Sequence, residues 1–80
     1  MTQAMNIASF CAMTCAEGGF HVFLTEKFGD EFGKIQDTDI ATRVVRHHCG
    51  ILSRRELNED GPAKSAWLEL QSEYKGWLMT

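Results

Sequence analysis

The stretch HHCGILSRREL, residues 47–57, carries the strongest local structural signal in the chain. Its glycine can adopt the left-handed conformation that ends a helix. Ser53 and Glu56 have the S-x-x-E spacing of a capping box, in which each side chain binds a backbone N–H at a helix start. Leu52 and Leu57 flank that box at the spacing of a hydrophobic staple. The stretch therefore predicts the end of one helix, a turn, and the start of a short second helix.

The segment before this turn predicts a helix that begins at Asp37 or Thr38 and ends at Gly50. Either of the first two residues can accept a hydrogen bond from a free N–H of the first turn. Side chains expected to point inward recur at helical spacing: Ile40, Ala41, Val44, Val45 and His48.

The segment after the turn predicts the longest apolar helix, starting at Pro62 after Asp60 or Gly61 as the cap. Its inward face would consist of Ala63, Trp67, Leu70, Tyr74, Trp77 and Leu78. Burying a tryptophan or a tyrosine removes roughly 150–250 Å² from water, so this helix is expected to be the main packing element. We expect it to pack against Phe10, Phe20, Phe23 and Val44.

The N-terminal half predicts two further helices. The first would start at the cap Asn6, bury a narrow stripe and stop at the glycine pair 18–19. That stripe consists of Ile7, Phe10, Cys11 and Thr14. The second would bury Phe20, Phe23, Leu24 and Phe28 and end at Gly29. The segment GDEFGKIQDTD that follows is expected to be a loop from which Phe32 and Ile35 reach the core.

Together these segments predict an all-α fold: a compact single domain over residues 1–80, a bundle of four to five helices of which one is short. The 80 residues are 44% hydrophobic and 24% charged, a globular balance. No apolar stretch approaches the roughly 20 residues of a membrane span. The first charged side chain is Glu17, so we expect no basic signal-peptide region, and the odd count of three cysteines favours reduced thiols. A cytoplasmic location is expected.

Metal binding and catalysis are the less favoured interpretations of the thiols and imidazoles. Zinc needs four ligands, yet Cys11, Cys15, His47, His48 and Cys49 contain no C-x-x-C pair. Consecutive residues of a helix point about 100° apart, so a cysteine next to a histidine in sequence does not form a catalytic dyad. We expect core cysteines, no metal, no cofactor and no enzyme activity.

A cluster of cations is the better candidate site. It consists of Arg43, Arg46, Arg54 and Arg55, with His47 as a contributor. Residues 43–55 contain no acid, although the net charge of the chain is −3. Aligning Gly50 on the turn glycine of a helix-turn-helix puts Arg46 where a small buried residue is required and Glu56 where an apolar one is required. The cluster is therefore a positive patch without a helix-turn-helix.

Two interpretations of this patch remain open. Arg54 and Arg55 would be the first two residues of the short helix, beside free N–H groups, which makes an anion-binding corner. The patch is then a partner-binding face for carboxylates or phosphates. Alternatively, the arginines pair with Glu56, Glu59 or Asp60 and form a solvated surface.

The C-terminal half, VVRHHCGILSRRELNEDGPAKSAWLELQSEYKGWL, resembles a pattern in small phage and prophage proteins of unassigned role. In that pattern a CG-apolar-x-SR-x-x-L block precedes a W-x-x-L-x-x-x-Y-x-x-W helix, and the likeness covers about 35 residues. The resemblance implies a phage accessory protein, and many of these are small non-enzymes that bind and block a bacterial machine, anti-CRISPR proteins being one class. It implies no catalytic residues.

Two functions follow as expectations. The first is a phage-type interaction protein that inhibits or modulates a host protein or ribonucleoprotein machine in the host cytoplasm. The second is a nucleic-acid-binding accessory protein that places the arginines on backbone phosphates. The negative net charge favours the first, and so does the absence of aromatic residues interleaved with the arginines as stacking platforms.

Overall fold

Four α-helices and one short 3₁₀-helix make up residues 6–80, the part of the chain that the computed structural model describes. In chain order they are α1 (Ile7–Cys15), α2 (Gly18–Phe32), α3 (Thr38–Cys49), η1 (Arg54–Asn58) and α4 (Pro62–Leu78). The prediction of an all-α bundle with one short helix is confirmed.

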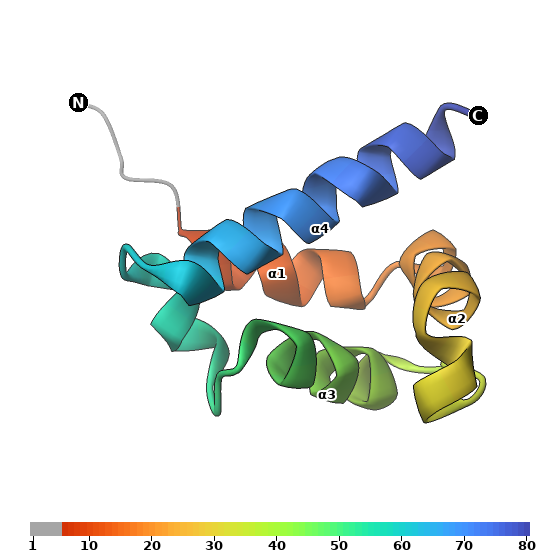
Figure 1. Cartoon of the computed structure of the whole chain (residues 1–80), viewed down its shortest axis with the longest axis horizontal. Helices are drawn as coiled ribbons and strands as arrows, with labels where there is room; N and C mark the ends of the chain where they lie inside the picture. Colours follow the sequence, from red (N-terminus) through yellow and green to blue (C-terminus); the bar gives the residue numbers. More distant parts are fainter. Residues whose placement is uncertain (1–5) are drawn as a thin grey trace.

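The longest helix, α4, lies across the molecule, with α1 and α3 beneath it (Figure 1). Helix α2 closes one end of the bundle and η1 the other. Contacts follow this arrangement: α4 packs on α3, η1 and α2, while α1 packs mainly on η1 and α3. The α4 helix thus joins elements from both halves of the chain.

The core is built around α4, as predicted, but Leu78 of its predicted inward face is 55% exposed. Trp67 is fully buried, and its ring meets Phe20 of α2 edge to face at a centroid distance of 6.1 Å. The ring centroid of Tyr74 lies 4.9 Å from that of Phe20 and 5.4 Å from that of Phe23. Aromatic pairs in such tilted arrangements contribute about 0.5–1.5 kcal/mol beyond their buried area.

The expectation that Phe10 joins this core is wrong, because 41% of the residue is exposed. The buried stripe of α1 consists of Ile7, Cys11, Thr14 and Cys15. Phe10 stands at the edge of that stripe, next to a groove between α1 and α4.

The glycine pair 18–19 was expected to end the first helix, but it opens α2. Helix α1 ends at Cys15, and the two helix axes meet at 87°. A Cβ on Gly19 would lie 3.0 Å from the Tyr74 hydroxyl oxygen, so glycine here permits the close approach of α4. No single helix among residues 6–80 is long and apolar enough to cross a membrane, and α1 and α2 meet that criterion only as this bent pair.

Helix α2 continues past Gly29 to Phe32, so the predicted loop is shorter than expected. Phe28 and Phe32 lie four residues apart on one face and both pack against the core, which favours the additional turn. The remaining loop, residues 33–37, does bring Ile35 into the core as predicted. Its N–H donates to Oγ1 of Thr25 at 3.0 Å.

The predicted helix ends are largely confirmed. Asn6 and Asp37 cap α1 and α3, Gly50 ends α3 with a φ of 70°, and Pro62 occupies the first turn of α4. The capping box also forms: Oε2 of Glu56 accepts the N–H of Ser53 at 2.8 Å.

The predicted hydrophobic staple does not form. Leu57 is fully buried, but Leu52 is 89% exposed and Ile51 takes the buried position. The staple geometry belongs to an α-helix, whereas η1 is a tighter 3₁₀-helix with about three residues per turn.

Candidate anion-binding cleft

Three of the predicted site residues line one polar cleft of about 270 Å³. Arg43 and Arg46 come from α3, and Arg54 comes from the first position of η1. Thr38, Asp39 and Thr42 complete the lining. We call this surface the arginine cleft.

Local sequence rules position the arginine cleft. Residues four apart share one face of a helix, which aligns Thr38, Thr42 and Arg46 along α3 and sets Arg43 one turn after Asp39. The left-handed Gly50 then turns the chain back so that η1 lies alongside. The two threonines and the aspartate are not among the predicted site residues, although the same i, i+4 spacing could have indicated them.

None of the four arginines has a carboxylate within 4.0 Å in the part of the chain that the structure describes. The acids that the alternative interpretation offered are engaged elsewhere or unpaired. Glu56 accepts two backbone N–H groups, and Asp60 pairs with Lys64 at 3.0 Å. The ion pairs with Glu56, Glu59 or Asp60 that the alternative interpretation predicts are therefore not formed among residues 6–80.

Arg46 adds an unsatisfied donor to the arginine cleft. Its Nε is buried and has no hydrogen-bond acceptor within residues 6–80. Leaving a buried donor without a partner costs about 1–3 kcal/mol, and more for a charged group. Arg46 thus lines the arginine cleft with a side chain whose donors are not all satisfied among residues 6–80.

Two arginines of the cleft influence the pKa of a buried thiol. Cys11 and Cys15 are fully buried with their Sγ atoms 3.9 Å apart. The hydrogen bond from the Cys11 thiol lowers the pKa of Cys15, and the charges of Arg54 and Arg46 lower it further. The same thiol pair and its burial raise the pKa of Cys11.

The structure places His47 and Arg55 outside the arginine cleft. Arg55 is exposed, and the His47 ring packs on Phe32 with a centroid distance of 5.2 Å. His48, predicted to point inward, is exposed and packs on Phe28. Phe28 and Phe32 of α2 contact the two imidazole rings on this side of α3, and Cys49 occupies the buried position instead.

The anion-binding corner expected at the short helix has fewer backbone donors than predicted. The η1 helix has five residues, and the N–H groups of its second and third residues already have acceptors. The N–H of Arg55 donates to Oγ of Ser53 at 3.4 Å. The N–H of Glu56 donates to the carbonyl oxygen of Ser53 at 3.0 Å. Anion binding at this place therefore depends mainly on the guanidinium side chains.

The predicted core location of the cysteines is confirmed. All three are buried free thiols, and burial raises the pKa of Cys49 to about 11. Residues 6–80 bring no three histidine, cysteine, aspartate or glutamate side chains together in a metal-binding arrangement.

Comparison with known proteins gives no match: no family model, curated protein or solved structure is similar to this chain. The chemistry of the arginine cleft therefore supplies the functional argument.

Proposed function

We propose that this chain is a small non-enzymatic interaction protein that binds an anionic surface of a bacterial protein or ribonucleoprotein machine through the arginine cleft. In this proposal it inhibits or modulates that machine in the host cytoplasm, as phage-encoded proteins of the anti-CRISPR kind do. The observation that supports it is the set of guanidinium groups that have no carboxylate partner among residues 6–80. Arginine forks bind carboxylates and phosphates in pairs of hydrogen bonds.

The composition of the arginine cleft favours a protein partner over an extended nucleic acid. Asp39 lies in the lining, and a run of phosphates crossing the cleft would meet its carboxylate. A protein surface can instead offer this aspartate a donor while its own acids meet Arg43 and Arg54. The net charge of −3 also opposes nonspecific binding to nucleic acid.

The placement of the thiols supports a role without catalysis. A nucleophilic cysteine must be reachable and ionised near neutral pH. Cys11 and Cys15 are fully buried, and the raised pKa of Cys49 keeps that thiol protonated.

A second function, binding of nucleic-acid phosphates, rests on the same three guanidinium groups. They have no carboxylate partner among residues 6–80, and a guanidinium group binds a phosphate as well as a carboxylate. If three arginines bind phosphates of duplex DNA, the logarithm of the association constant should fall with the logarithm of the salt concentration with a slope of roughly −3. Measuring the affinity for DNA at several salt concentrations therefore distinguishes this function from binding to a protein, which depends less on salt.

The experiment is affinity capture from a bacterial lysate, followed by measurement of the dissociation constant of the captured partner. Replacing both Arg43→Glu and Arg54→Glu should weaken binding at least tenfold, or about 1.4 kcal/mol. The matched control is Lys34→Glu with Lys64→Glu. Since each reversal removes two positive charge units, both double variants change the net charge from −3 to −7.

The control separates a specific site from overall charge. Lys34 is exposed, and Lys64 takes part only in an exposed pair with Asp60, whose loss costs little. Equal weakening in both double variants would mean that net charge, and not the arginine cleft, governs binding. Undiminished binding by a folded Arg43→Glu, Arg54→Glu variant would refute the proposal.

A further inference from the structure

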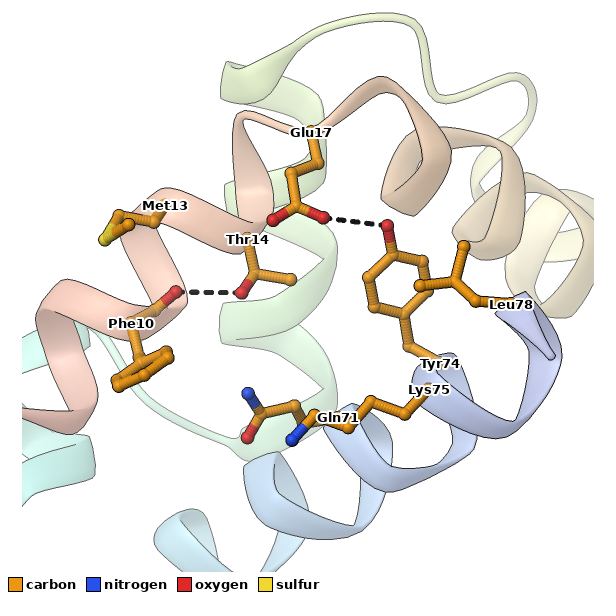
Figure 2. A pocket seen from close by; sticks show the side chains of 8 residues that line it. All are labelled: Phe10, Met13, Thr14, Glu17, Gln71, Tyr74, Lys75 and Leu78. Carbon is orange, nitrogen blue, oxygen red and sulfur yellow. Dashed lines mark hydrogen bonds between the residues drawn. The ribbon is translucent and has the colours of Figure 1, made fainter.

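A second depression lies away from the arginine cleft, between α1 and α4 (Figure 2). It has a volume of about 270 Å³, and none of its lining residues lines the arginine cleft. Phe10 and Met13 form one wall, and Tyr74, Lys75 and Leu78 of α4 form the other. We call it the α1–α4 groove.

Exposed apolar side chains gather at this groove. Phe10 and Met13 of α1 are 41% and 68% exposed, and Leu78 of α4 is 55% exposed. Met79, which is also exposed, directly follows Leu78 in the chain. Apolar side chains concentrated around one depression mark an interaction surface, because removing them from water lowers the free energy.

One acid and one base stand on opposite sides of the α1–α4 groove. Glu17 precedes α2 and accepts the Tyr74 hydroxyl proton at 2.8 Å through Oε1, which leaves its other oxygen free. Lys75 lies on α4 across the groove (Figure 2). Neither Glu17 nor Lys75 forms an ion pair within 4.0 Å among residues 6–80.

We propose that the α1–α4 groove is the interface of a homodimer, covered by the same groove of a second copy of this chain. A two-fold interface uses the same patch twice, so residue i of one copy meets residue j of the other and the reverse. An axis through the middle of the groove places each Glu17 opposite the Lys75 of the other copy. A surface with one acid, one base and apolar residues between them is complementary to itself.

The molecule has enough surface for this contact. A stable interface buries about 800 Å² per partner, roughly 15% of the 5366 Å² that this chain exposes. The chain measures 40 × 28 × 19 Å, so its broad face can supply that area. The arginine cleft shares no lining residue with the groove, so the contacts made by the groove residues do not involve it.

The test is the mass of the full chain in solution, measured by sedimentation equilibrium over roughly micromolar to millimolar concentrations. The mass should rise from 9.0 kDa toward twice that value. Met13→Glu should weaken the dimer at least tenfold. The matched control is Val22→Glu, a change of the same kind at a 52% exposed residue of α2 outside the groove, which should leave the dimer intact.

Charge reversal tests the pairing across the axis. Glu17→Lys and Lys75→Glu should each be monomeric alone, because like charges then face each other. An equal mixture of the two variants should form a heterodimer, since each lysine again meets a glutamate. A mass of 9.0 kDa at every concentration would overturn the proposal, whether the groove stays open or binds another partner. A dimer that survives Met13→Glu, or a mixture that stays monomeric, would overturn it too.

Discussion

Tyr74 links the aromatic core to the surface of the molecule. Its ring lies against Phe20 and Phe23, and its hydroxyl donates to Oε1 of Glu17. Burial, followed by the hydrogen bond to the Glu17 carboxylate, raises the pKa of Tyr74 to about 12. Folding therefore favours the neutral phenol.

This raised pKa gives the stability a defined dependence on pH. The contribution of Tyr74 is fully present below the unfolded value of about 10 and is lost as the pH rises through about 12. Tyr74 is the only tyrosine, so tyrosinate absorbance reports it alone. We expect a midpoint near 12 in buffer and near 10 in urea. Equal midpoints in the two solvents would contradict this placement of the hydroxyl.

Trp67 tests the centre of the core. It is fully buried, so Trp67→Ala should lower the free energy of unfolding by about 3–5 kcal/mol, much of the stability of a domain this small. Its Nε1 has no acceptor among residues 6–80, so Trp67→Phe removes an unsatisfied donor and should cost clearly less. Urea denaturation measures both. Similar losses for the two variants would indicate that the indole N–H is satisfied in solution.

At the scale of the elements, the sequence predicted the helix ends that depend on interactions between residues close in the chain. The caps at Asn6, Asp37 and Ser53 follow from side chains that bind N–H groups two or three residues away. The role of Gly19 could not be predicted in this way. It depends on the approach of Tyr74, which is distant in sequence.

The capping box supplies the prediction at this scale. Ser53→Ala should lower the free energy of unfolding by about 1 kcal/mol, because the start of η1 loses an acceptor. Leu52→Ala is the control. Since Leu52 is exposed and forms no staple, this substitution should change the free energy of unfolding by no more than about 0.5 kcal/mol. Denaturant midpoints measure both variants. An unchanged midpoint for Ser53→Ala would place the stabilisation of this turn in other residues.

At the scale of the whole molecule, the sequence located the positive patch but not its shape. Arg43, Arg46 and Arg54 meet because the turn at Gly50 folds η1 back onto α3. Whether a given side chain faces that cleft depends on tertiary packing. His47 turns to Phe32 because α2 extends further than its glycines indicate.

The central claim is that the arginine cleft is an anion-binding site, and nuclear magnetic resonance of the arginine Nε–H groups tests it most directly. The chain has only four arginines, and Arg55 lies outside the cleft, which makes it an internal control. On titration with an oligoglutamate peptide, the signals of Arg43, Arg46 and Arg54 should shift together and saturate, while that of Arg55 moves little. No saturating shift, or an equal shift of all four signals, would contradict the claim.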